Sequence, residues 1–324
     1  MGPDAAVAEV RHAVRRVLGD RPALVACSGG ADSLALAAAT AFEASRRGLP
    51  AGLITIDHGV QPGSAAQART VAAIGYELGF DPVQVVRVEV RTGGGLESSA
   101  RNARYAALSA AADAAGAAVL LGHTLDDQAE TVLLGLGRGS GPRSIAGMRA
   151  VDGRYLRPLL GVRRTTTVAA CVALGFTPWD DPHNADSAFT RVRLRREVLP
   201  LLEDVLQGGV AGALARTAEL IRDDLDALDA VAECTLADVG DEHVLPVAEL
   251  VNLAPAIRSR VLRLWTAKCG AGPLTATHLA ALDAMVGGWH GQGPIDLPGG
   301  CVVTRTSGRL TMRRVVPAAT PAEE

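Results

Sequence analysis

The sequence predicts an α/β protein in which a Rossmann-like, doubly wound parallel sheet is followed by a smaller, mainly helical C-terminal domain. Short β-rich apolar runs alternate with longer Ala- and Leu-rich stretches through the first half of the chain. This alternation is typical of a parallel sheet with helices on both faces. A length of 324 residues exceeds that of one ordinary domain, and a content of 48% apolar residues allows a substantial core.

The expected elements follow one another in regular order. Apolar strands are predicted to end near residue 26 and to span residues 52–56, 83–90 and 117–121. Helices are predicted from residue 31 and over residues 65–78, 97–114, 211–236 and 255–267. The alternation fades after residue 206, and short strands return after residue 295. We therefore expect a catalytic domain at 1–206, a second domain at 207–316 and a disordered tail at 317–324.

Composition excludes several classes of protein. No apolar run approaches the roughly 18 residues that a membrane span needs, and the N-terminus lacks a secretory apolar region. We therefore expect a soluble, cytoplasmic protein with no membrane partner. The five cysteines are odd in number and widely scattered, which indicates neither a disulfide framework nor a zinc or iron–sulfur site.

The charge distribution is uneven along the chain. A net charge of −3 argues against indiscriminate binding of nucleic acid. Between residues 138 and 196, however, eleven arginines accompany only four acidic residues. Guanidinium groups can fork onto phosphates, so RNA is a reasonable partner for this stretch. The alternative is a solvated, arginine-rich surface.

A glycine-turned, hydroxyl-rich loop follows the first strand and opens directly into a helix. Glycines that accept positive φ let the backbone approach an anion, and the helix amides carry a positive dipole end. Asp32 can hold a Mg²⁺ ion that bridges phosphate oxygens. The expected ATP-binding residues of the loop are Ser28, Gly29, Gly30, Ala31, Asp32 and Ser33.

The loop lacks the lysine of a Walker motif. Its pattern, S-G-G-x-D-S, instead resembles the pyrophosphate loop, or PP-loop, of the N-type ATP pyrophosphatases. That resemblance implies cleavage of ATP between its α- and β-phosphates and adenylation of a substrate oxygen. A bare glycine turn between a strand and a helix is the alternative, although it leaves the serines and Asp32 unexplained.

A second polar cluster follows the fourth expected strand. His123, Asp127 and Glu130 are spaced by four and three residues, which predicts one shared face at the start of a helix. Acidic residues are also favoured in the first turn of any helix, which would account for Asp126 and Asp127 without a function. That alternative explains neither His123 nor Gln128.

Further motifs make the resemblance specific. The PP-loop, the Asp57-His58-Gly59 turn, Arg101-x-x-Arg104-Tyr105, G-H-x-x-D-D-Q-A-E-T and Arg138-Gly139-Ser140-Gly141 occur in this order. Arg157-Pro158-Leu159-Leu160 and an arginine-rich segment at 191–195 follow them. Together these motifs resemble the tRNA(Ile)-lysidine synthetase family over essentially all of the first domain.

The resemblance implies a two-step reaction on the wobble cytidine of a tRNA(Ile) with the anticodon CAU. ATP, with Mg²⁺, would first adenylate the C2 carbonyl oxygen and release pyrophosphate. The ε-amine of free L-lysine would then displace AMP and give lysidine. The oligomeric state stays open, with a homodimer among the alternatives.

Roles follow residue by residue from the same resemblance. Catalysis would depend on Asp32, His123 and Asp127, with His123 either an acid/base or an electrostatic stabiliser. Asp57 and His58 would join the loop in binding ATP. The lysine-binding residues would be Asp127, Glu130 and one arginine among Arg191, Arg193 and Arg195. The tRNA-binding residues would be Arg101, Arg104, Arg138, Arg143 and Arg157, and the arginine run extends to Arg164.

Two other readings compete with this one. Another adenylating enzyme with the same loop, such as an amidotransferase-linked ligase or a tRNA thiolase, would share the nucleotide chemistry. A thiolase would require paired cysteines, which this sequence lacks. A small-molecule ligase would not need the excess of arginine between residues 138 and 196. A nucleotide sensor without turnover would have little use for a second, carboxylate-lined pocket.

Overall fold

A computed structural model of the chain describes residues 2–57, 59, 63–88, 96–139, 141–181, 186, 188–239 and 243–315. His58 and the tail expected at 317–324 lie outside the described residues. The chain divides into two compact units, Met1–Ile221 and Arg222–Glu324. The division falls inside a long helix, α10 (Val210–Val239), and the boundary expected at residue 206 stays a prediction.

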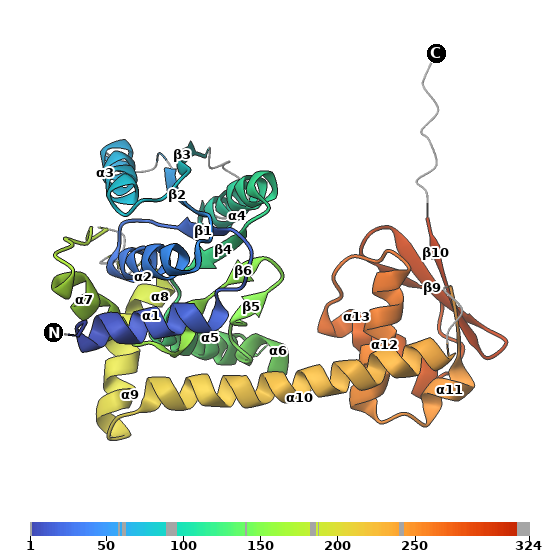
Figure 1. The fold of residues 1–324 in the computed structure, drawn as a ribbon. Coiled ribbons are helices and arrows are strands. Elements are labelled where there is room, and N and C mark those ends of the chain that lie inside the picture. Colours follow the sequence, from blue (N-terminus) through green and yellow to red (C-terminus); the bar gives the residue numbers. More distant parts are fainter. Residues whose placement is uncertain are drawn as a thin grey trace, which may run out of the picture. The chain divides into compact units, whose positions relative to one another are not determined.

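The first unit is built around one sheet with strand order β3-β2-β1-β4-β6-β5 (Figure 1). Its strands are β1 (Ala23–Ala26), β2 (Ala51–Asp57), β3 (Val83–Arg87), β4 (Ala118–Leu121), β5 (Val151–Asp152) and β6 (Tyr155–Leu156). Strands β3, β2, β1 and β4 pair in parallel, as predicted. Strand β6 extends the parallel pairing beside β4, and β5 is an antiparallel edge. Strands of two residues are too short to give a sequence pattern, so β5 and β6 were not predicted.

Helices cover both faces of this sheet (Figure 1). On one face pack α1 (Ala5–Val17), α2 (Ala31–Arg47), α3 (Ser64–Glu77) and α7 (Arg164–Ala173). On the other face packs α4 (Leu96–Ala115). The doubly wound architecture is therefore confirmed, with fully buried side chains such as Val25 and Leu120 at its centre.

Helix α1 was not predicted, although its sequence carries two helix signals. The Asp4 carboxylate accepts a hydrogen bond from Ala6 N at 2.8 Å and so caps the first turn. Val7, Val10 and Val14 repeat at helical spacing and are buried against α2 and α7. The helix therefore supports, from behind, the elements that carry the site.

The remaining elements of the first unit surround the carboxyl edge of the sheet. They are α5 (Leu125–Arg138), α6 (Pro142–Ile145), η1 (Pro158–Gly161), α8 (Thr190–Arg193), η3 (Leu194–Val198) and α9 (Leu199–Val205). Helix α5 begins at Leu125 with Thr124 as its cap. The prediction that His123 shares a helix face with Asp127 is therefore wrong: His123 lies on the connection between β4 and α5.

The second unit is mainly helical and also contains an antiparallel sheet with strand order β7-β10-β9-β8. Its complete elements are β7 (Val244–Pro246), α11 (Val247–Val251), α12 (Pro255–Lys268), α13 (Ala276–Gly287), β8 (Ile295–Leu297), β9 (Cys301–Thr306) and β10 (Arg309–Arg314). Trp265 is 1% exposed and lies in the core of this unit.

Membrane-spanning potential is confined to one bent pair of helices. Among the described residues no single helix is both long and apolar enough to cross a bilayer. Thr190–Val205 and Val210–Val239 meet that length and composition only when taken together, and they are bent by 96°.

Candidate active site

The loop after β1 adopts the sharp turn that its glycines allow. Gly29 has a φ of +88°, and a Cβ at this position would lie 2.4 Å from Gln67 Nε2. Gly30 instead has a φ of −74° and forms the cap of α2. Of the two loop glycines, only Gly29 uses the positive φ that both could adopt. The turn presents the first amides of α2 to the space above the sheet.

The two serines of the loop have different roles. Ser33 Oγ accepts a hydrogen bond from Ser28 N at 3.1 Å and donates one to Gly30 O at 2.9 Å. Ser33 is 7% exposed, so its hydroxyl shapes the loop from below. Ser28 Oγ lies 3.2 Å from Ser33 Oγ; both serines line the cavity, but Ser28 is exposed whereas Ser33 is buried. Ser28 is thus the hydroxyl better placed to meet a ligand.

A cavity of about 710 Å³ opens over this loop at the carboxyl edge of the sheet. The cavity is lined by the loop, by charged groups from α4, α5 and α7, and by the segment around Trp179. Trp179 N donates to Gly29 O at 2.9 Å, which holds this segment against the loop. The charged and titratable side chains in the wall are Asp32, Arg104, His123, Asp127, Arg164, Asp180, Arg195 and Arg196.

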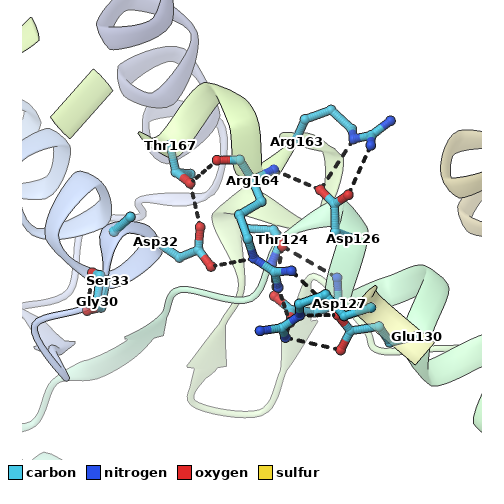
Figure 2. Close-up of polar contacts among 12 residues, drawn as sticks. Gly30, Asp32, Ser33, Thr124, Asp126, Asp127, Glu130, Arg163, Arg164 and Thr167 are labelled. Carbon is cyan, nitrogen blue, oxygen red and sulfur yellow. Dashed lines mark hydrogen bonds and ion pairs between the residues drawn. The ribbon is translucent and has the colours of Figure 1, made fainter. Parts of the chain in front are cut away.

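Arg164 stands at the centre of an acidic cluster, as Figure 2 shows. Its Nε lies 3.2 Å from Asp32 Oδ2, and its Nη2 lies 2.7 Å from Asp127 Oδ1. Its Nη1 lies 3.5 Å from Glu130 Oε1. Thr167 Oγ1 donates to the other oxygen of Asp32. One guanidinium thus connects the loop carboxylate with two carboxylates of α5.

Arg195 approaches the same carboxylates from η3. Its Nε donates to Glu130 Oε1 at 2.8 Å, and its Nη2 lies 3.3 Å from Glu130 Oε2 and 3.4 Å from Asp127 Oδ1. Asp127 Oδ2 accepts from Thr124 N at 2.8 Å and from Thr124 Oγ1 at 2.7 Å, which closes a capping box at the start of α5. The capping box turns Asp127 inward.

Asp126 points away from this cluster and anchors the start of α7 (Figure 2). Its Oδ2 accepts from the backbone N of Arg164 at 2.7 Å, and its Oδ1 lies 3.0 Å from Arg163 Nη2. Arg163 also lies 3.9 Å from Glu203, which caps α10 through Val210 N and Ala211 N. Asp126 therefore fixes the backbone from which Arg164 projects.

Burial and charge shift the protonation of the site groups. Burial raises the pKa of Asp32 above its ordinary value, because its effect exceeds the opposing effects of Thr167 and Arg164. Burial also disfavours charge on Asp127, but Arg164 and Thr124 outweigh it and hold the pKa of Asp127 below its ordinary value. Burial, helped by Arg104, lowers the pKa of His123 to about 4 against the pull of Asp127. His123 is therefore neutral at pH 7, and its buried Nδ1 has no hydrogen-bond partner among the described residues.

Only one member of the predicted arginine set reaches the acidic cluster. Arg193 Nη2 pairs with Glu197 on the surface at 2.9 Å, and Arg191 is half-buried one turn before Arg195. Asp57 ends β2 and accepts from Gly59 N at 2.9 Å, but it does not line the cavity. The structure therefore singles out Arg195 from the three arginines.

The arginines expected to meet tRNA fall into three environments. Arg138 and Arg143 are exposed, and exposed Arg101 lies over the ring of Tyr105 at 4.8 Å. Arg104 faces the cavity beside His123. Arg157 is 6% exposed and donates to Arg149 O at 2.9 Å. Arg157 was expected to contact a tRNA phosphate, and in this structure its guanidinium binds the backbone carbonyl of Arg149.

Sequence reasoning missed the central position of Arg164, which it had placed among the tRNA contacts, and missed Thr124 and Thr167 altogether. Thr124 precedes the acidic pair by two residues, so the capping-box spacing was available as a signal. Arg164 and Thr167 lie 132 and 135 residues beyond Asp32, and no local pattern links them to it.

The fold and the cradle at the start of α2 define a PP-loop protein, a class that uses ATP. A PP-loop domain family matches residues 5–202, and a family described as the TilS substrate binding domain matches residues 245–311. The chain belongs to the tRNA(Ile)-lysidine synthase family. It is 57% identical to the tRNA(Ile)-lysidine synthase of Thermobifida fusca over 95% of this chain and 98% of that protein. It is 52% identical to that of Streptomyces coelicolor over 97% and 100%.

Solved structures show the same fold at greater distance. The U34-tRNA thiolase NcsA from Methanococcus maripaludis matches with a TM-score of 0.54 and 18% sequence identity. The match covers 67% of this chain and 80% of that protein. At this identity the likeness establishes the fold alone.

Proposed function

We propose that this chain ligates lysine to C2 of the wobble cytidine of CAU-anticodon tRNA(Ile), through an adenylated tRNA, and releases AMP and pyrophosphate. The observation that carries the proposal is that one cavity is lined both by the PP-loop and by Asp127, while Glu130 lines a smaller cavity that shares Arg164 and Arg195 with the first. A nucleotide sensor has no need of a second, carboxylate-lined subsite. Family membership favours lysine and tRNA(Ile) as the substrates.

The loop end of the cavity suits the phosphates of ATP. The amides that open α2, the hydroxyl of Ser28 and the positive helix end all favour negative charge there. Asp32 fits a Mg²⁺ site, because Mg²⁺ in phosphate sites takes one or two carboxylates and fills its other positions with phosphate oxygens and water. When bound there, Mg²⁺ would neutralise charge on the leaving pyrophosphate.

The α5 end of the cavity suits an amino acid. Asp127 and Glu130 offer negative charge to an ammonium, and the guanidinium of Arg195 can turn to a carboxylate. Asp127 and Arg195 line the large cavity, and Glu130, bound to Arg195, lines the smaller one. Their charges complement free lysine at both of its ends.

His123 suits a proton acceptor better than a fixed positive charge. The attacking ε-amine must lose a proton before or as it displaces AMP. His123 lines the cavity and is neutral at pH 7. A neutral imidazole in hydrogen-bond reach of the amine can accept that proton, and its pKa of about 4 makes it a weak base in this role.

The part of the wall around Trp179 suits the tRNA. Trp179, Pro178 and Val168 give an aromatic and apolar surface against which an extruded cytosine can stack. Outside the cavity, exposed Arg138 and Arg143 provide charge for the phosphate backbone. We further propose a cytoplasmic enzyme, since its tRNA substrate is there, and a homodimer stays an open alternative.

The test is exchange of labelled pyrophosphate into ATP with no lysine present. The proposal predicts exchange that requires both Mg²⁺ and the CAU-anticodon tRNA(Ile), because the adenylate forms on the tRNA. Methionine tRNA with the same anticodon is the control and supports none. Exchange that occurs with free lysine and without tRNA would instead mean activation of the amino acid, and the proposed route would be wrong.

A further inference from the structure

The lysine subsite is already filled by the protein's own cations. All four carboxylate oxygens of Asp127 and Glu130 lie within 3.5 Å of a donor from Arg164, Arg195 or Thr124. Glu130 is fully buried, so water offers it no other partner. An incoming ammonium must therefore displace one of the two guanidinium groups.

Arg164 is the group that can be displaced by a ligand bound elsewhere. Arg195 contacts Asp127 and Glu130, whereas Arg164 also reaches Asp32 beside the PP-loop. Any cation that occupies Asp32 repels the guanidinium, and any phosphate above the loop attracts it. The two subsites therefore share one mobile charge.

The backbone beneath Arg164 is fixed, and its side chain has room to move. Asp126 holds the backbone N of Arg164 at 2.7 Å. The side chain lines both the cavity of about 710 Å³ and a smaller cavity of about 140 Å³, as does that of Arg195. Side-chain rotation can thus carry the guanidinium from the carboxylates to the phosphate end without unfolding α7.

We propose that Arg164 is a positioning residue that fills the lysine subsite until bound Mg·ATP draws its guanidinium away, so that the nucleotide binds before lysine. This inference rests on the proposed function. It makes the two ligands bind cooperatively, and the coupling is reciprocal: lysine must strengthen nucleotide binding by the same factor. Removal of Arg164 uncouples the two subsites.

Equilibrium dialysis of labelled lysine tests the inference, with and without Mg²⁺ and a non-hydrolysable α,β-methylene analogue of ATP. In the unaltered protein we expect the analogue to tighten lysine binding by about tenfold or more, within the usual range of allosteric coupling. Arg164→Gln should bind lysine without the analogue, and the analogue should change its affinity by less than about twofold. Arg164→Lys keeps the positive charge but loses the planar, multidentate guanidinium, so we expect the analogue to change its lysine affinity by an intermediate factor.

Arg163→Gln is the matched control, because Arg163 is the neighbouring arginine and touches none of the three carboxylates of the cluster. It should retain the full coupling. Equal coupling in Arg164→Gln and the unaltered protein would overturn the inference. So would a folded Arg164→Gln that binds no lysine in either state, because Arg164 would then be a lysine ligand.

A second measurement separates this inference from the proposed function. If the unaltered protein with the analogue bound no lysine at all, the proposed function would fail. The affinity of the analogue alone would still decide the role of Arg164. We expect Arg164→Gln to bind the analogue several-fold more weakly than Arg163→Gln, since its guanidinium no longer reaches the phosphates. Equal affinities would refute the movement of Arg164.

Discussion

Nε of Arg195 lies 2.8 Å from Oε1 of Glu130, although 65 residues separate the two and the Glu130 side chain is fully buried. A buried carboxylate without a partner is costly. The ion pair therefore holds α5 and η3 together, and it also keeps a negative charge in place for a ligand. The same carboxylate meets Arg164 at 3.5 Å. Glu130 is thus the most enclosed charged group of the proposed lysine subsite.

Glu130→Gln should raise the KM for lysine by about tenfold or more, because a neutral amide loses a charge-assisted contact with the ammonium. Adenylation of the tRNA should change little. Glu197→Gln is the matched control, since Glu197 pairs with Arg193 on the surface and such exposed pairs contribute little to stability. Steady-state kinetics of the full reaction and single-turnover adenylation give the two readouts. Equal loss in both steps would assign Glu130 to the nucleotide or the fold.

Asp32→Ala should lower the rate of adenylation by about 10² or more if its carboxylate positions Mg²⁺ at the pyrophosphate. The Mg²⁺ concentration for half-maximal rate should rise with it. Rapid-quench measurement of tRNA adenylate formation over a Mg²⁺ series gives both numbers. An unchanged rate and an unchanged Mg²⁺ requirement would remove Asp32 from the metal site.

The depressed pKa of His123 makes stability depend on pH. Above pH 6.5 the imidazole is neutral in both the folded and the unfolded chain, and it contributes nothing to this dependence. As the pH falls from 6.5 to about 4, only the unfolded chain takes up the proton, so the folded state loses stability. At pH 5 that loss is about 2 kcal/mol.

Urea unfolding of the unaltered protein and of His123→Asn at pH 7 and pH 5 measures this loss. The fall in unfolding free energy between the two pH values should be smaller in the variant by about that amount. An identical fall in both proteins would mean that the pKa of His123 is not lowered on folding, so that the folded state is protonated at pH 5.

Gly29 and Gly30 should respond differently to alanine. At Gly29 the φ of +88° is strained for alanine, and the new Cβ would lie 2.9 Å from Val71 Cγ2. At Gly30 the nearest atom to a new Cβ is Ser28 Oγ at 3.8 Å. We expect Gly29→Ala to lower the unfolding free energy by about 2 kcal/mol or more and Gly30→Ala by less than about 1 kcal/mol. Equal losses in thermal unfolding would contradict this geometry.

Replacing an exposed arginine should change the salt dependence of tRNA binding, whereas replacing a buried arginine should not. Arg143→Ala should weaken binding and reduce the slope of log K against log salt by roughly one unit. Arg157→Ala should instead lower thermal stability, because the side chain is 6% exposed and bound to Arg149 O. A reduced slope for Arg157→Ala with unchanged stability would place Arg157 on the tRNA surface.

The sequence predicted those parts of the site whose residues are contiguous. The PP-loop and the His123 cluster each lie on one strand-to-helix connection, and parallel strands bring such connections to one edge. The doubly wound sheet followed from the same alternation. The second unit's sheet was foreseen only as short strands, since its strands span as few as three residues.

What could not be predicted depends on contacts between distant segments or on irregular backbone. Arg164 lies in the site because Asp126 fixes the start of α7, a contact across 38 residues that no local spacing encodes. The choice of Arg195 over Arg191 and Arg193 follows a π-helical turn at Leu194–Val198. Such a turn shifts the helical phase, so a 3.6-residue period could not identify the inward arginine.

Incorporation of labelled lysine into a CAU-anticodon tRNA(Ile) transcript, with ATP and Mg²⁺ present and methionine tRNA as the control, shows whether the protein forms lysidine. The account predicts one lysine per isoleucine tRNA with equal release of AMP, and none in the control. Cleavage of ATP to AMP with no lysine on either tRNA would contradict the lysidine assignment and leave only the PP-loop chemistry.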